Sequence, residues 1–179
     1  GIPYYDKELI AMAAKKSGIR EDLLKEIDER ATNSFLYSLV MGVGAFGTRG
    51  IGTEDLPIND RLFLIQNDLI HEIASEGPCV IVGRCADYIL ENKFNCVNVF
   101  IHAPMEFRMK RAMEVYGLSK AGLENKINKI DKGRASYYNY YSNRTWGKVD
   151  NYHLTFDSSV LGIEKSVDLI AAFAEKKKA

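Results

Sequence analysis

The chain has 179 residues, the usual length of one domain with a full hydrophobic core rather than of two independent domains. Lysine plus arginine and aspartate plus glutamate both number 24, so the formal net charge is zero and no whole-molecule field attracts nucleic acid or an anionic membrane. No apolar run approaches the roughly 18 residues that span a bilayer, and no signal sequence opens the chain. Its three cysteines form no CxxC pair. We expect a cytoplasmic protein without a polynucleotide or membrane partner; a homo-oligomer is compatible with this composition.

The first 30 residues predict a strand and two helices. Residues 1–5 are apolar and aromatic, as in a strand, and Asp6 behind them is a residue type that caps helices. The chain starts as if in mid-fold, so we expect a segment before it. Apolar residues at helical spacing then predict a helix that ends near Gly18 (Leu9, Ile10, Ala13, Ala14). Residues 20–30 predict a second, highly charged helix.

Glycines accumulate between residues 42 and 52. Residues 42–47 match G-x-G-x-x-G, the spacing of dinucleotide-binding loops. However, residues 48–57 contain no convincing helix to present its N-terminus to a pyrophosphate. We expect a substrate-covering or ordinary surface loop, with residues 41–52 more mobile than the flanking helices.

A helix and a buried strand are predicted next. Residues 58–75 carry an inward apolar stripe, with Arg61 beside it (Leu62, Ile65, Leu69, Ile73). Residues 79–82 are β-branched on both faces, which favours a strand covered on both sides in a parallel sheet. Gly83 ends that strand and places Arg84 at its carboxyl end, where open α/β sheets bind ligands. We expect Arg84 to bind a phosphate or carboxylate; the alternative is an ion pair with Asp87.

Residues 97–101 predict another strand, followed by Pro104 and a helix over residues 105–116. Arg108 and Arg111 share a face of this helix, so they repel unless an anion or acids lie between them. Glu106 and Glu114 are the acids that could satisfy them. The repeated strand–helix pattern indicates parallel strands joined by right-handed crossovers.

The next helix carries an arginine on an apolar stripe. The stripe repeats every three or four residues from 123 to 141 (Leu123, Ile127, Ile130, Arg134, Tyr137, Tyr141). A buried arginine is costly without a partner, so Arg134 should meet a carboxylate or a phosphate. The tyrosines could stack on bases, but helical tyrosines more often pack with their hydroxyls at the rim. Residues 152–156 predict the last strand, 157–159 a polar loop and 163–173 a final helix.

In order and spacing these pieces closely resemble the cytidylate-kinase-like branch of the nucleoside monophosphate kinases, over nearly the whole chain. The stretches that carry the resemblance are Tyr4–Ile10, Val80–Arg84, Asp131–Arg134, Tyr137–Gly147 and Asp157–Ser159. The resemblance implies one domain over residues 1–179, with a three-layer α/β, P-loop-kinase-like fold, a mostly parallel sheet and a helical lid at about residues 105–150. The family's glycine-rich phosphate loop, with its strand and helix, is missing ahead of the Tyr4 region.

The resemblance also implies ATP and Mg²⁺ as cofactors, a small nucleotide as substrate, and a set of site residues. The expected catalytic residues are Arg84, Arg108, Arg111 and Arg134. The expected substrate-binding residues are Arg61, Arg84, Asp87, Asp131 and Arg134, and the expected cofactor-binding residues are Arg108, Lys132, Asp157 and Ser158. Cys85 stands where cytidylate kinases carry an acid and Met12 where they carry an arginine, so the acceptor's identity stays open.

The leading hypothesis is therefore ATP-dependent phosphoryl transfer to a nucleoside monophosphate or similar small acceptor. Such transfer depends on positioning and charge neutralisation, which arginines supply. The first alternative is a non-catalytic module that senses nucleotides or binds anions. The second is a structural interaction protein, in which Arg84 and Arg134 pair internally with acids.

Overall fold

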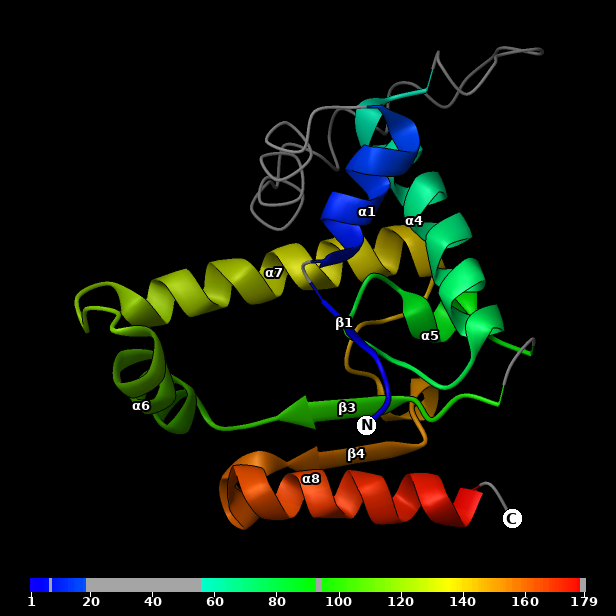
Figure 1. Ribbon diagram of the computed structural model, residues 1–179. Helices are drawn as coiled ribbons and strands as arrows, with labels where there is room; N and C mark the ends of the chain where they lie inside the picture. Colours follow the sequence, from blue (N-terminus) through cyan, green and yellow to red (C-terminus); the bar gives the residue numbers. More distant parts are fainter. Residues whose placement is uncertain (7, 19–55, 93–94, 178–179) are drawn as a thin grey trace.

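The computed structural model describes residues 1–6, 8–18, 56–92 and 95–177. Strands and helices alternate along this part of the chain, which makes it an α/β protein (Figure 1). The elements are β1 (Tyr4–Tyr5), α1 (Glu8–Ser17), α4 (Ile58–Glu76), β2 (Val80–Ile81), α5 (Ala86–Ile89), β3 (Val99–His102), α6 (Met105–Tyr116), α7 (Leu123–Ser142), the 3₁₀ helix η2 (Val149–Asn151), β4 (Leu154–Asp157) and α8 (Ser158–Lys177). The helix expected over residues 20–30, the glycine-rich loop and the expected mobility of residues 41–52 lie outside the described residues.

All strand pairing in the described ranges is parallel, as the strand–helix alternation predicts. Tyr4 pairs with Val80 in the β1–β2 sheet, and Val99 pairs with Leu154 in the β3–β4 sheet. The expectation of one larger sheet is not met by these residues, because they form two separate two-stranded sheets.

The prediction that residues 79–82 are covered on both faces is wrong for the described structure. The β-strand shrinks to two residues, and Val80 and Val82 are each 43% exposed. Cys79 and Ile81, on the opposite face of this run, pack against the core, so the run is covered on one face and partly exposed on the other. A β-branched run predicts a strand, but its burial depends on what packs against it.

The core forms where α1 packs on α4 and where α4 meets α5. The four apolar positions predicted for the first helix are all buried, and so are three of the four predicted for residues 58–75 (Leu9, Ile10, Ala13, Ala14; Leu62, Leu69, Ile73). The first cluster joins α1 and α4 through side chains such as Ala13 and Leu69. The second adds α5 and reaches Tyr138 of α7. These contacts hold the end of β2 against the helices.

Helices α6 and α7 form an arm, a name used below for residues 105–142. Leu123 and Ile127 at the start of α7 are buried against Ala112 of α6. The last turns of α7 pack instead on the core. With 20 residues, α7 is about 30 Å long. In Figure 1 it runs from α6 at one end of the molecule to a position below α1 and beside α4.

The turn between α6 and α7 is built from glycines in the left-handed region. Gly117 has a φ of 64° and donates its N–H to Met113, while Leu118 donates to Ala112. The bond from Gly117 to Met113 is that of the αL motif, which ends a helix. Gly122, with a φ of 69°, stands immediately before α7. The turn therefore reverses the chain and lets α6 lie against the first turns of α7.

The polar loop expected at residues 157–159 is not a loop. Asp157 is the last residue of β4, and α8 begins at once with Ser158. The expected final helix over residues 163–173 is part of α8, which bends at Gly162, where φ is 76° and ψ is 171°. Within the described ranges no helix is both long enough and apolar enough to cross a membrane.

Candidate functional site

The chain leaves β2 through three consecutive residues in the left-handed region. The φ angles are 71° at Gly83, 56° at Arg84 and 57° at Cys85. For a residue with a side chain this conformation costs roughly 1–2 kcal/mol. Hydrogen bonds from Ala86 to Gly83 and from Ile89 to Cys85, with burial of the Cys85 side chain, hold the turn in place. Strain of this kind collects at ligand-binding sites.

This turn places Arg84 in a half-buried position at the carboxyl ends of β1 and β2. Burial lowers the pKa of Arg84, and the neighbouring Tyr137 and Asp6 partly oppose that shift. These three side chains come from the end of β2, from α7 and from the end of β1. We call them the Arg84 site. It combines a guanidinium with a tyrosine hydroxyl and a carboxylate, a set that can bind a phosphorylated molecule.

Helix α4 forms a wall behind this site. The Tyr137 hydroxyl donates a 3.2 Å hydrogen bond to Oε1 of Gln66, and the Tyr141 hydroxyl donates a 2.9 Å bond to Asp60. The Phe63 ring stacks on Tyr141 at 4.1 Å. Arg61, expected to bind substrate, lies half-buried in the first turn of the same helix. Tyr137 and Tyr141 thus pack on α4, and their hydroxyls form hydrogen bonds with its polar side chains.

Asp87 does not pair with Arg84. Its Oδ2 accepts a 2.6 Å hydrogen bond from the Tyr138 hydroxyl. Burial, and then this bond, raise the pKa of Tyr138. Arg144 and the Tyr152 hydroxyl lie close to the same hydroxyl. The alternative given for Arg84, an ion pair with Asp87, is therefore not what the structure contains.

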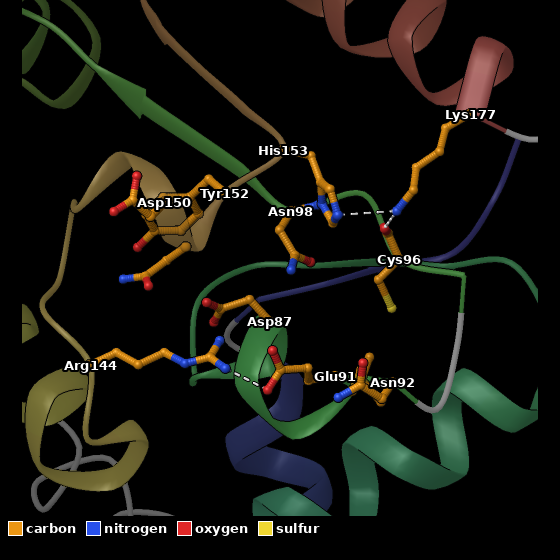
Figure 2. Close-up of a pocket in the computed structure, with 12 residues that line it drawn as sticks. Asp87, Glu91, Asn92, Cys96, Asn98, Arg144, Asp150, Tyr152, His153 and Lys177 are labelled. Carbon is orange, nitrogen blue, oxygen red and sulfur yellow. Dashed lines mark hydrogen bonds and ion pairs between the residues drawn. The ribbon is translucent and has the colours of Figure 1, made fainter.

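Asp87 instead lines a polar cleft of about 460 Å³ between α5, the entries to β3 and β4, and the end of α8 (Figure 2). Its lining residues are Asp87, Leu90, Glu91, Asn92, Cys96, Asn98, Arg144, Asp150, Asn151, Tyr152, His153 and Lys177. Figure 2 shows the Arg144 side chain reaching to Glu91, where the ion pair is 2.5 Å. Neither Arg84 nor any arginine of the arm is among its lining residues.

The cations of this cleft already have protein partners. Arg144 binds Glu91 and lies 5.4 Å from the centre of the Tyr88 ring. Lys177 donates to the carbonyl of Cys96 and lies 3.3 Å from Nε2 of His153. Burial, with Lys177 nearby, lowers the pKa of His153. No local sequence pattern marks this cleft, because its residues come from five separate segments.

Removing the Tyr138 hydroxyl should destabilise the protein. A hydrogen bond to a charged group contributes roughly 1.5–3 kcal/mol, and Tyr138→Phe deletes the 2.6 Å bond to the Asp87 carboxylate. We expect a loss of about that size in the free energy of unfolding, measured with urea. Tyr116→Phe is the control, because Tyr116 is 67% exposed and should change stability by less than about 0.5 kcal/mol. Equal stability of both variants would contradict the assigned bond.

The arm holds its own charged cluster, centred on Asp131. Arg108 of α6 binds Asp131 at 2.7 Å, and Arg134 binds it at 3.3 Å. The acids considered for Arg108 and Arg111 were the wrong ones: Glu114 instead pairs with Lys110 at 4.0 Å. Arg111 is half-buried and Lys132 is exposed on the same arm.

Arg134 is not buried as its stripe position predicted. Its side chain is 55% exposed, although Leu123 and Ile127 before it and Tyr138 after it are buried. The packed side of α7 at this point carries Gly133, which is buried, and Arg134 beside it lies on the exposed side. Arg134 does meet a carboxylate, as expected, but on its own helix.

Asp157 and Ser158 stand at the carboxyl ends of β3 and β4. Asp157 Oδ1 accepts hydrogen bonds from the N–H and the hydroxyl of Ser159, at 2.8 and 2.7 Å, and these bonds lower its pKa. The Ser158 hydroxyl donates to the His102 carbonyl at 3.2 Å. The expected site residues therefore lie in four separate places. Arg84 and Arg61 lie at the Arg84 site and on the helix behind it, and Asp87 lies in the polar cleft. The other two places are the arm, with the Asp131 cluster, and the strand end with Asp157 and Ser158.

The cysteines are free thiols. Cys85 is 3% exposed, and burial, with Asp87 nearby, raises its pKa to about 12. Because the thiolate is the reactive form, the thiol of Cys85 should be alkylated by iodoacetamide at pH 8 at least ~1,000-fold more slowly than an ordinary thiol. Peptide mass spectrometry of the native and urea-unfolded protein measures this. Fast labelling of Cys85 in the native protein would contradict its burial.

Residues 1–160 match the family model described as the cytidylate kinase-like family. Among solved structures, the chain is similar to an uncharacterized protein from Eubacterium ventriosum ATCC 27560. The TM-score is 0.63 at 26% sequence identity, and the match covers 98% of this chain and 84% of the other. No curated protein matches the chain. The family match covers the Arg84 site and the whole arm.

Proposed function

Since this chain belongs to the cytidylate kinase-like family, we propose that it transfers the γ-phosphoryl group of ATP to a nucleoside monophosphate or a similarly small phosphorylated acceptor. The observation that carries the proposal is the Arg84 site. A strained turn at the ends of two parallel strands holds a half-buried guanidinium beside Tyr137 and Asp6. A planar guanidinium fits a phosphate with two parallel hydrogen bonds.

The arm supports the same proposal. A phosphoryl-transfer site needs cations that arrive with closure, so that water is excluded while charge is neutralised. Arg108 and Arg134 stand together on the arm, and Asp131 holds both. In the proposed enzyme the arm is the lid, and the phosphates take the place of Asp131 as their partner.

We also propose that the two sheets belong to one P-loop-kinase-like sheet, completed by the strand that carries the family's phosphate loop. The support is that β2 and β3 each have one described strand neighbour, and that apolar side chains on them are exposed (Val80, Val82, Ile101). A two-stranded sheet by itself is only marginally stable in water.

ATP and Mg²⁺ fit the described residues only in part. Arginines for phosphates are present, but no group of three or more His, Cys, Asp or Glu that could hold a metal lies in the described part of the chain. In kinases Mg²⁺ is held largely by the nucleotide phosphates and neutralises their charge.

A phosphoryl-transfer assay on the complete protein tests the proposal. ATP and Mg²⁺ are supplied with CMP, UMP, AMP or GMP, and each diphosphate product is separated by ion-exchange chromatography. We expect one or two acceptors to give product well above the ATP hydrolysis measured without acceptor. Binding of a monophosphate by calorimetry with no product from any acceptor would favour the non-catalytic nucleotide-sensing module instead. A protein that neither binds a monophosphate nor forms a product would overturn both the kinase proposal and the nucleotide-sensing alternative.

A further inference from the structure

The core of the protein contains a glutamine with one unpaired amide atom. Gln66 of α4 is 1% exposed, and the other comparably buried large side chains are apolar (Leu9, Ile70, Leu123). Its Oε1 accepts the Tyr137 hydroxyl at 3.2 Å, while Nε2 has no hydrogen-bond partner among the described residues. Turning the amide over only exchanges which atom is unpaired. Buried polar groups are nearly always paired, and an unpaired one costs stability.

The neighbours of Gln66 connect it to the Arg84 site. The Tyr137 ring is held edge-on by Phe63 at 6.5 Å and lies 4.8 Å from the Tyr141 ring. Tyr137 is also a neighbour of Arg84 that raises the pKa of this guanidinium against the effect of burial. Gln66 therefore stands behind Tyr137, and Tyr137 stands beside the guanidinium. A leucine at position 66 would fill much the same space without burying an unpaired amide nitrogen, although the Tyr137 hydroxyl would lose this hydrogen bond.

We propose that Gln66 is a positioning residue for the phosphate of the acceptor, acting through the Tyr137 hydroxyl; this rests on the proposed function. Without ligand, Tyr137 donates its hydrogen to Oε1 of Gln66. When a phosphate binds at Arg84, the amide rotates by half a turn and Nε2 donates to the Tyr137 oxygen. The hydroxyl hydrogen is then free for a phosphate oxygen. No covalent bond changes; Nε2 gains an acceptor while Oε1 gives up its donor, and the phosphate gains the hydrogen bond from Tyr137.

The amide is suited to this exchange because it can both accept and donate. A leucine can do neither. A glutamate can accept the tyrosine hydrogen but, when ionised, cannot donate one in return. Glutamine, glutamate and leucine are similar in size, but they differ in the hydrogen bonds that they can make at this buried position. We therefore expect Gln66→Leu to weaken phosphate binding without lowering stability.

The experiment is a calorimetric titration of the complete protein with CMP, UMP, AMP and GMP, together with urea unfolding. For the acceptor that the wild type binds, we expect Gln66→Leu and Tyr137→Phe each to raise Kd roughly 5- to 20-fold. The double variant should lose no more than either single variant, because both act on one hydroxyl. Gln66→Leu should unfold at an equal or higher urea concentration than the wild type.

Two further variants make the outcome specific. Gln66→Glu should bind more weakly than the wild type at pH 8 and recover as the pH falls toward 5, where a protonated carboxyl can donate. Tyr141→Phe, which removes the neighbouring bond to Asp60, should leave Kd within about twofold. Wild-type Kd in both Gln66→Leu and Gln66→Glu would overturn the positioning role while the proposed function stands. A wild type that binds none of the four nucleotides would overturn the proposed function and this role with it.

Discussion

Replacing Arg84 with asparagine should weaken acceptor binding by about 10- to 100-fold and leave the fold intact. A charge-assisted hydrogen bond contributes roughly 1.5–3 kcal/mol, and each 1.4 kcal/mol is a factor of ten in Kd. Asparagine is among the residues that best tolerate a φ near 56°, so the turn should persist without the guanidinium. Calorimetry of the variant against the acceptor found in the transfer assay measures the effect, and circular dichroism measures the melting temperature.

Two more substitutions at Arg84 separate its charge from its shape. Arg84→Lys keeps the charge but loses the planar fork, so its Kd should fall between those of wild type and Arg84→Asn. Arg84→Gly removes the strain of a side chain in the left-handed region, and its melting temperature should equal or exceed that of wild type. If Arg84→Asn binds the acceptor as tightly as wild type, the turn serves the fold and not the phosphate.

The helices could be predicted from sequence because their signals are local. Seven of the eight apolar positions predicted at helical spacing in α1 and α4 are buried, and the predicted ends lie within one or two residues of the observed ones. Pro104 precedes α6 directly, as its position in the sequence indicated. Parallel pairing followed from the order of strands and helices. The helix predictions needed only residues a few positions apart, and the pairing prediction needed only the order of the elements.

The burial of each strand and the partner of each charged side chain could not be predicted from local patterns. Burial of residues 79–82 depends on elements far away in sequence, and Val80 is exposed. Asp87 is bound by Tyr138, 51 residues away, and Arg108 is bound by Asp131, not by an acid of its own helix. Arg134 lies on a predicted apolar stripe, yet its side chain is 55% exposed, while Gly133 next to it is buried. A periodic pattern locates a face, but it does not say how far along the helix a partner extends.

The same distinction applies to the candidate site. The sequence placed Arg84 after a strand, and the structure adds what stands beside it: Asp6 and Tyr137 at the site, with Gln66 behind the tyrosine. Gln66 occupies an ordinary polar position in the sequence of an amphipathic helix. Its interest lies in its 1% exposure and its unpaired amide, which only the packing of α7 on α4 creates.

Arg134→Met should lower kcat/KM by about 100-fold or more while leaving the melting temperature nearly unchanged. The guanidinium is 55% exposed and its pair with Asp131 lies within one helix, so the pair contributes at most a few tenths of a kcal/mol to stability. In the proposed enzyme, however, closure of the arm brings Arg134 to the phosphates, where a cation acts on transition-state charge. An interaction made only in the transition state lowers kcat more than it raises KM.

Steady-state kinetics of Arg134→Met therefore test whether the arm is the lid. Lys126→Met removes one exposed positive charge from the same helix and should retain wild-type kcat, which controls for a change in net charge. Asp131→Asn removes the charge of the acid that binds both Arg108 and Arg134. Arg108 then loses its 2.7 Å ionic partner, so the cluster should loosen and KM should change. If Arg134→Met keeps wild-type kcat/KM, the pair with Asp131 only steadies the arm, and the cations for phosphoryl transfer must come from elsewhere in the chain.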